Sequence, residues 1–388
     1  MLPFVNMSGD PEQEYFSDGI SEDITTDLSR MPRLFVIARN SSFQYKGRHV
    51  DVRKIGEELG VKYILEGSVR KAGERVRITA QLVQAKTGEQ LWAHRYDREM
   101  QDIFALQDEI TRNIAAELEI KLVEGEQARG WQRSTSNLEA YDLALRGRDL
   151  TIRMTMEDRI RGRHLVEKAL ELDPKFAYAT VLLGRTYVTE AVSGRSETPD
   201  KSLDRAIKLG NQALVLDETL SEAHGLLCQT FRYKGEHDRA VEHGQRALAL
   251  NPDDADSTTN FASVLARVGR GVEALDRMET ALRLNPFPPY FYLRVLGIVY
   301  RSLGRFEEAI EVYRKCVEHL PDYFVAQIGL TLAYMDAERE EEGRAQAHHI
   351  LRINPSFSSS SNPYLVQYKD LVQREQFVTL LRKAGLPE

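Results

Sequence analysis

The sequence predicts two fold classes in one chain: an α+β domain, in which helices cover a mixed sheet, followed by an all-α solenoid of helical hairpins. Apolar and polar residues alternate over residues 76–82, which is typical of a half-buried strand. After residue 138, short segments recur about every 34 residues, which is typical of stacked hairpins. With 388 residues, 42% of them hydrophobic and 29% charged, the chain has the length and composition for both parts.

The predicted boundaries divide the chain into four segments. Residues 1–122 form the α/β domain, residues 123–137 a linker, residues 138–356 the repeats in about six hairpins, and residues 357–388 a loop with a C-terminal capping helix. Glycines and serines in the second segment favour irregular backbone, which is why we assign it as a linker.

Two helices and a strand are predicted first. Asp10 followed by proline is typical of a helix start, because the carboxylate caps free N–H groups and proline fits the first turn. We expect this helix to run to about Ser29. The apolar stretch Leu34–Ala38 predicts a short buried strand. Residues 51–59 have apolar side chains on one face and stop before Gly60, which predicts a second helix.

Three strands and a third helix follow. Residues 63–69, 76–82 and 90–96 are predicted as strands with glycine-containing turns between them. The apolar stripe from Ile103 to Leu118 predicts a helix. With a first strand at the start of the chain, the order β-α-β-α-β-β-β-α is typical of a small domain with a mixed sheet.

The repeats are recognisable from similar helix ends. These end at residues 174, 218, 252, 286, 321 and 355; after a first interval of 44, the intervals are 34 or 35 residues. We place the roughly ten extra residues of the first interval in a loop at residues 191–199. A last helix, expected at about residues 363–384, would cover the end of the stack.

The repeat region resembles the tetratricopeptide repeat family. In residues 290–321, Leu296, Gly297, Tyr300 and Ala309 occupy slots that recur in register in the other repeats. The resemblance covers roughly residues 139–356 and implies a solenoid that binds other polypeptides.

The N-terminal region resembles the TolB-like amino-terminal α/β domain. The segments Leu2–Phe16, Leu65–Arg70 and Leu91–Asp97 carry this resemblance, which covers about residues 2–122. In many bacterial proteins that domain precedes tetratricopeptide repeats and follows a class III adenylate or guanylate cyclase domain or the winged-helix domain of CadC-like regulators. Since Met1 falls inside the family's first strand, we expect the native protein to extend upstream.

The composition and the lack of known motifs argue against catalysis or metal binding by this chain. The formal net charge of −7 disfavours general nucleic-acid binding. No phosphate-binding glycine motif and no H-E-x-x-H occurs, and Cys228 and Cys316 are too few for a zinc module or a disulfide framework. We therefore predict no catalytic, cofactor-binding or metal-binding residues, and cyclase activity only if an upstream catalytic domain exists. Without a secretory signal or a membrane span, the predicted location is the cytoplasm.

The candidate site is the concave face of the repeats. In the tetratricopeptide family the first helix of each hairpin lines this groove, and the register of the resemblance places nine residues on it: Arg185, Arg232, Arg267, Arg294, Arg301, Tyr178, Tyr233, Gln229 and Phe291. Arginine beside aromatic residues suits an acidic, partly apolar peptide. The alternative is a solvated charged face, which Asp256, Glu222 and Asp336 in the same groove favour.

Three functions stay open. We prefer a regulatory scaffold of a bacterial signalling system that binds proteins or acidic peptides through the groove. The alternatives are the sensory accessory region of a class III adenylate cyclase and a small-molecule sensor that acts through the α/β domain. The sequence does not name the partner or fix the oligomeric state.

Overall fold

The computed structural model describes residues 1–31, 34–117, 135–152, 156–192, 198–360 and 364–388. These residues group into two units, which are defined by the following ranges. Unit 1 contains Met1–Ala223, Leu248–Asp254 and Leu284–Phe287; unit 2 contains His224–Ala247, Ala255–Arg283 and Pro288–Glu388.

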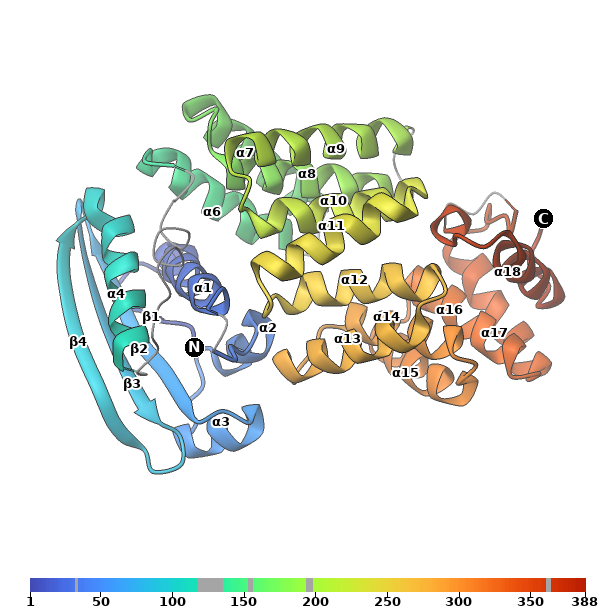
Figure 1. Ribbon diagram of the computed structural model, residues 1–388, viewed down its shortest axis with the longest axis horizontal. Helices are drawn as coiled ribbons and strands as arrows, with labels where there is room; N and C mark the ends of the chain where they lie inside the picture. The colour runs from blue at the N-terminus through green and yellow to red at the C-terminus, as the bar shows by residue number, and fades with distance from the viewer. Residues whose placement is uncertain (32–33, 118–134, 153–155, 193–197, 361–363) are drawn as a thin grey trace. The chain divides into compact units, whose positions relative to one another are not determined.

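A four-stranded sheet in the order β1-β2-β3-β4 forms one layer of unit 1 (Figure 1). β1 (Val5–Asn6) pairs in parallel with β2 (Tyr63–Ala72). β2, β3 (Arg75–Gln84) and β4 (Glu89–Glu99) pair antiparallel in sequence order. The prediction of a mixed sheet is therefore confirmed.

Helices α1 (Glu14–Ser29) and α4 (Ile103–Glu117) cover one face of this sheet. A core forms where their apolar side chains meet alternate strand residues; Phe16, Ile78 and Tyr96 are among its fully buried members. The alternation of β3 is explained by this covering, because only one of its faces lies under helices.

The helix starts and stops follow the expected local chemistry. The Asp10 side chain accepts the Glu12 N–H at the start of a short 3-10 turn that leads into α1. α3 (Val52–Leu59) begins after Asp51, whose side chain accepts a backbone N–H, and ends at Gly60, which has a φ of 65°. Only glycine adopts that left-handed conformation without strain.

The stretch Leu34–Ala38 is not a strand, so that prediction was wrong. The Val36 N–H donates to the Asp253 carboxylate at 3.1 Å, and the Ala38 N–H donates to the Leu284 carbonyl at 2.7 Å. Helix α2 (Arg39–Ser42) follows directly. Within the stretch only Val36 and Ile37 are buried, and Ile37 packs with Ile55 and Ile64 of the α/β layer. An apolar run does not reveal which surface covers it or which groups its backbone bonds.

Twelve helices follow α4 in the described part of the chain before the C-terminal segment. They form successive helix–turn–helix units: α6 (Leu138–Ile152) and α7 (Met156–Leu172), α8 (Ala177–Val192) and α9 (Pro199–Leu216), α10 (Ser221–Lys234) and α11 (His237–Leu250), α12 (Ala255–Arg267) and α13 (Gly271–Leu284), α14 (Tyr290–Ser302) and α15 (Phe306–His319), α16 (Phe324–Asp336) and α17 (Glu340–Ile353). Gly235, Gly269 and Gly304, all with positive φ, make three of the turns. The all-α solenoid is therefore confirmed.

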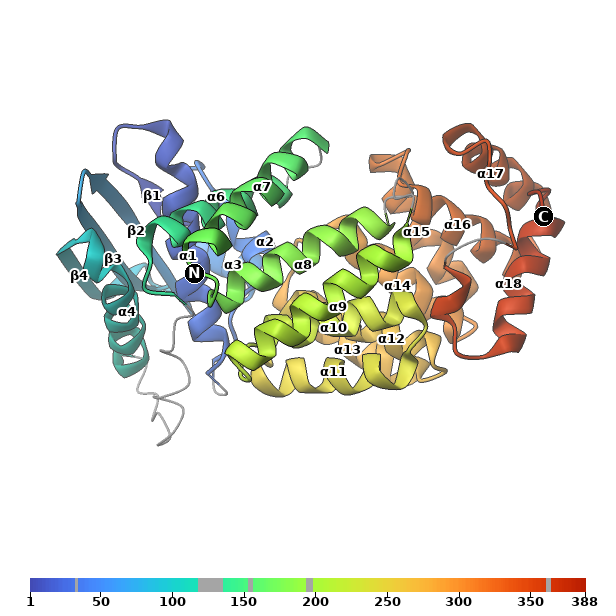
Figure 2. The same cartoon turned by 90° about the horizontal axis from the view of Figure 1, so that it is seen from above.

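The extra residues of the long repeat lengthen its helices. α8 and α9 have 16 and 18 residues, whereas α14 to α17 have 13 or 14. Figure 2 shows α8 and α9 side by side. The predicted loop 191–199 therefore overlaps the helix ends, and its centre lies outside the described residues, as does most of the predicted linker 123–137.

The C-terminal helix begins later than predicted. α18 (Leu371–Lys383) starts after Asp370, whose side chain accepts the Val372 N–H at 2.9 Å. Residues 364–370 form a short 3-10 turn and extended backbone, and we call this segment the strap. Apolar residues of α18 are buried with those of α16 and α17, so the helix covers the end of unit 2 as expected of a cap.

No described helix has the length and apolar character needed to cross the bilayer. The predicted compartment stays a prediction.

Candidate functional site

The structure divides the nine candidate residues between the two units. Arg185 and Tyr178 lie on α8 in unit 1, where Arg185 is exposed and Tyr178 is half-buried. The other seven lie in unit 2 on α10, α12 and α14. Unit 2 therefore holds most of the candidate residues.

Arg232 and Arg267 are buried, with only 2% and 4% of their surface exposed. Arg232 Nη1 donates to the Ser263 hydroxyl at 3.2 Å and to Gln367 Oε1 at 3.0 Å. Arg267 Nη1 donates to the Ser263 carbonyl at 2.8 Å and to the Ser263 hydroxyl at 2.5 Å. All of these acceptors are neutral, although the donors are charged.

Both guanidinium groups are under-satisfied. Arg232 Nε and Arg267 Nε are buried and have no hydrogen-bond partner among the described residues. Polar groups that are buried without a partner are uncommon in folded proteins. Neither arginine forms an ion pair with a carboxylate in the part of the chain that the structure describes, so the local positive charge is not compensated.

The titration behaviour reflects this uncompensated charge. Burial, aided by the neighbouring Arg232 and Arg294, lowers the pKa of Arg267 to about 10. Burial acts to raise the pKa of Tyr233, but the charges of Arg232, Arg294 and Arg267 outweigh it and leave the pKa below its ordinary value. The Arg232 guanidinium lies 4.3 Å from the centroid of the Tyr233 ring. The surroundings of Tyr233 are therefore positively charged.

Arg301 differs from the first pair because it has a carboxylate partner, whereas Arg294 has a neutral one. Arg294 Nε donates to the Tyr323 hydroxyl at 2.9 Å. Arg301 forms an ion pair with Asp336, with Nη2 and Oδ2 2.6 Å apart and the carboxylate side chain 5% exposed. Asp336 thus neutralises Arg301, whereas Arg232, Arg267 and Arg294 donate to neutral acceptors.

The remaining candidates border this cluster less closely. Gln229 on α10 and Phe291 on α14 are both half-buried. The Phe291 ring packs edge-on against Tyr292, with centroids 4.6 Å apart. Phe291 therefore belongs to an aromatic pair within α14.

Sequence reasoning missed that the strap lies against these arginines. Gln367 is 1% exposed and accepts from Arg232, and the Lys369 N–H donates to the Arg267 carbonyl at 3.1 Å. The Tyr368 ring centroid is 5.6 Å from the Arg267 guanidinium. The strap is the dark red segment just before α18 in Figure 1. One signal was present: Asp370 is a good N-cap, which places the helix start after the strap.

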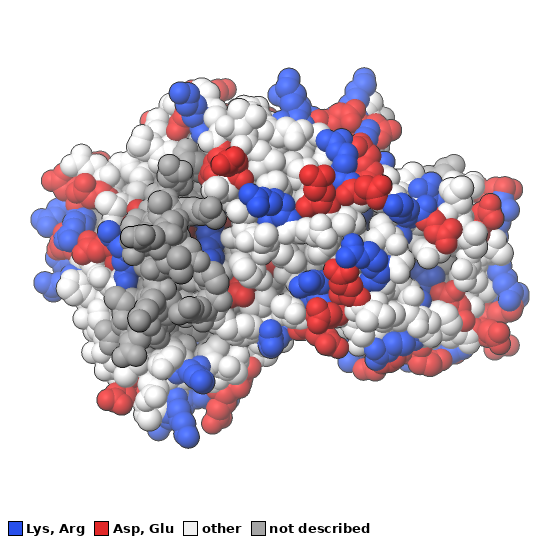
Figure 3. Space-filling view, viewed as in Figure 1, with Lys and Arg blue, Asp and Glu red and all other residues white. Residues whose placement is uncertain are grey.

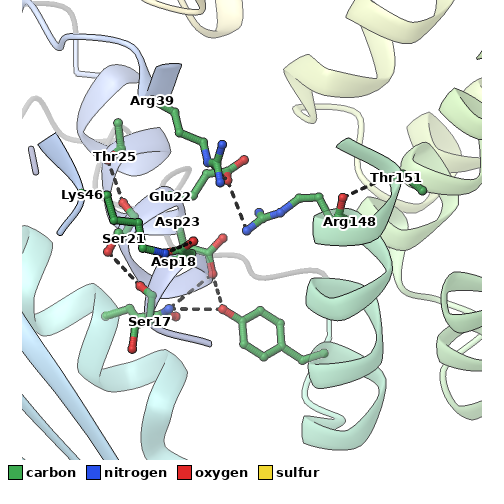
Figure 4. A network of polar contacts seen from close by, with 12 residues as sticks. Ser17, Asp18, Ser21, Glu22, Asp23, Thr25, Arg39, Lys46, Arg148 and Thr151 are labelled. Atoms are coloured by element: carbon green, nitrogen blue, oxygen red, sulfur yellow. Dashed lines mark hydrogen bonds and ion pairs between the residues drawn. The ribbon is translucent and has the colours of Figure 1, made fainter. Parts of the chain in front are cut away.

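Sequence reasoning also missed a partly buried ionic network in unit 1, shown in Figure 4. Glu22 on α1 binds Arg39 Nε at 2.7 Å and Arg148 Nη2 at 3.2 Å. Asp18 binds Lys46 Nζ at 2.6 Å. Because each cation has a carboxylate and Arg148 belongs to α6, this network joins the first repeat helix to the α/β layer.

Elsewhere the described chain offers little reactive chemistry. The described residues contain no group of three or more His, Cys, Asp or Glu side chains that could hold a metal ion. Cys228 and Cys316 are buried, and burial raises the pKa of each thiol to about 12, so neither is a reactive thiolate. On the face shown in Figure 3, acidic and basic side chains are interspersed.

Comparison with known proteins places one repeat in a named family. The tetratricopeptide repeat model matches residues 290–323, which include α14 and α15. Residues 290–323 are therefore similar to one tetratricopeptide repeat, and they lie within the all-α solenoid of helical hairpins.

Two curated proteins and one solved structure are similar to parts of this chain. "Putative adenylate cyclase 3" of Rhizobium meliloti (strain 1021) is 46% identical over 244 residues, which are 63% of this chain and 41% of that protein. The small glutamine-rich tetratricopeptide repeat-containing protein 2 of Mycosarcoma maydis is 32% identical over 116 residues, 29% of this chain and 33% of that protein. A thermophilic tetratricopeptide protein of Thermus thermophilus, of known structure, is 20% identical; the match covers 50% of this chain and 98% of that one, with a TM-score of 0.40. The chain thus spans less than half the length of these two curated relatives.

Proposed function

We propose that the groove of unit 2 binds an acidic peptide segment of another protein, and that the chain serves as a non-catalytic regulatory scaffold. One observation carries this proposal: Arg232 and Arg267 are buried, face neutral acceptors only, and keep their Nε donors without partners among the described residues. A ligand that supplies carboxylates would satisfy both groups.

The chemistry of arginine selects the class of ligand. A carboxylate can accept two parallel N–H bonds from one guanidinium, and such charge-assisted bonds are about twice as strong as neutral ones. Tyr233, next to Arg232, and Tyr323, which is bonded to Arg294, can pack against apolar or aromatic side chains of the same peptide. We therefore expect a peptide in which acidic and aromatic residues alternate.

A random copolymer of glutamate and tyrosine provides a defined probe. We expect the fluorescently labelled copolymer to bind the intact chain, and the double variant Arg232→Gln/Arg267→Gln to bind it at least about tenfold more weakly, because two charge-assisted contacts are lost. Fluorescence polarisation measures both affinities, and circular dichroism confirms that the variant is folded.

The matched control is Arg161→Gln/Arg344→Gln. It removes the same charge from two exposed arginines, whose side chains are 65% and 60% accessible. We expect its affinity to stay within about twofold of the parent, since screened surface charges contribute little. Equal losses in both double variants would show non-specific attraction and contradict a site at the groove.

A second function is favoured by the Rhizobium relative. Its name and the 46% identity support the proposal that this chain is the accessory region of a class III adenylate cyclase, with a TolB-like α/β domain ahead of the repeats. Sequencing the coding region upstream would reveal a catalytic domain in frame, and cyclic AMP formation by that full polypeptide would be measured with and without Arg232→Gln/Arg267→Gln. Absence of such a domain removes this candidate. The small-molecule sensor stays a prediction.

A further inference from the structure

We propose that the strap, residues Tyr364–Asp370, is an intramolecular ligand of the arginine groove, and that an acidic peptide binds by displacing it. The inference rests on the proposed function of that groove and adds its regulation. The strap and the arginines all belong to unit 2.

The strap is seated on the groove through its backbone and through its side chains. The Lys369 N–H donates to the Arg267 carbonyl at 3.1 Å, and Lys369 Nζ lies 2.7 Å from Asp238 Oδ1. At the turn after α10, a Cβ added to Gly235 would come within 2.9 Å of the Val366 carbonyl oxygen. Such a close approach along successive residues is how a groove holds an extended peptide.

The strap nevertheless satisfies the groove poorly. Gln367 offers Arg232 one neutral oxygen, and its own Nε2 is buried with no partner among the described residues. The Nε atoms of Arg232 and Arg267 are likewise buried and have no hydrogen-bond partner among the described residues. The two arginines and the strap therefore all contain buried N–H donors without acceptors in the described part of the chain. A negatively charged acceptor would satisfy the arginines.

A glutamate side chain in place of the glutamine would supply that acceptor. It would remove the unpaired amide donor and present two carboxylate oxygens to Arg232. The natural Gln367 thus makes the strap a weak occupant, which a peptide with carboxylates can replace.

The strap is tethered on both sides by contacts within the cap, and Arg374 of α18 also donates to the Tyr368 carbonyl at 2.7 Å. Before it, Phe357 is buried with apolar residues of α16 to α18, and the Ser359 N–H donates to the Pro387 carbonyl at 2.9 Å. After it, α18 is anchored by the buried Phe377 and Leu381. A tethered segment competes at a high effective concentration, which requires an external peptide to bind the groove more strongly than the strap does.

Two substitutions at one position test the inference because they act in opposite directions. With the labelled glutamate–tyrosine copolymer as probe, we expect Gln367→Ala to raise its affinity by about tenfold, since the strap loses its bond to Arg232. We expect Gln367→Glu to lower the affinity by about tenfold, since the strap becomes a better ligand. Both are measured on the full chain by fluorescence polarisation, with thermal melting to confirm folding.

Gln376→Glu is the matched control, because it introduces the same charge on an exposed position of α18. It should leave the affinity unchanged. A second loosening variant, Tyr368→Leu, removes the contact with Arg267 and should raise the affinity in the same direction as Gln367→Ala.

The outcomes separate the inference from the function on which it rests. If the parent and all three strap variants bind the copolymer equally, while Arg232→Gln/Arg267→Gln loses it, the groove binds acidic peptides and the strap does not compete. If neither the parent nor the loosened strap variants bind the copolymer, the proposed function fails as well. An affinity that falls by the same factor in Gln367→Glu and Gln376→Glu also overturns the inference, because the added charge alone would explain the loss.

Discussion

Two arginines in this chain, one in each unit, are buried to a similar degree, but only one of them has a carboxylate partner. In unit 1, Arg148 is 7% exposed and pairs with Glu22 at 3.2 Å. In unit 2, Arg267 is 4% exposed and donates to neutral oxygens of Ser263. Burial opposes the charge of Arg148, but Glu22 outweighs it and raises the pKa of that guanidinium above its ordinary range, whereas the pKa of Arg267 falls to about 10.

The comparison separates a structural charge from one that lacks a partner. A buried ion pair that is complete holds two elements together, as Glu22 does for α1 and α6. A buried cation without a counter-charge costs stability, and a binding site is a reason for a protein to retain it. This difference supports a structural role for the network of unit 1 and is the basis of the proposal that the pair in unit 2 binds a ligand.

The largest effect on stability is expected in unit 1. Glu22→Gln removes the carboxylate that serves both Arg39 and Arg148 and leaves the buried Arg148 without its ion-pair partner. We expect a loss of about 3 kcal/mol in the free energy of unfolding, measured by urea denaturation. The control Glu157→Gln breaks an exposed pair with Arg161 and should change stability by less than about 0.5 kcal/mol. A loss below about 1 kcal/mol for Glu22→Gln would mean that the two arginine sites do not differ as described.

The opposite result is expected for Arg267→Met. The substitution removes a charge that has only local neutral partners and replaces it with an apolar side chain of similar length. Stability should change by no more than about 1 kcal/mol and can increase, because a buried charge without a partner is replaced. Urea denaturation measures this change. A loss of about 3 kcal/mol would show that Arg267 is a structural residue, and the proposal for the groove would lose one of its two arginines.

The fold was predictable where the periodic pattern of apolar residues in the sequence follows which side chains are buried. The interval of 34 residues located the repeats, and the alternation in residues 76–82 located β3, because both patterns follow from which side chains are covered. Leu34–Ala38 was assigned wrongly because a buried extended segment and a strand have the same composition. The difference between them is the acceptor of the backbone hydrogen bond, here Asp253 and Leu284.

The candidate site was only partly accessible from the sequence. Counting in register selected Arg232, Arg267, Arg294 and Arg301, and the structure describes all four in unit 2. Their different surroundings were not predictable, since Asp336 neutralises Arg301 through a contact 35 residues away. The contact of the strap with the arginines was also not predictable from the sequence, because Gln367 lies 135 residues after Arg232 in the chain.

Amide hydrogen exchange of the full chain, with and without the unlabelled glutamate–tyrosine copolymer, tests the central claim most directly. We expect saturating copolymer to accelerate exchange at Lys369, whose N–H is bonded to Arg267, by at least about tenfold, because the strap leaves the groove. Exchange at Ile78 in the sheet of unit 1 should stay unchanged. Undiminished protection of Lys369 while the copolymer is bound would contradict the account, because the acidic ligand would then occupy another surface.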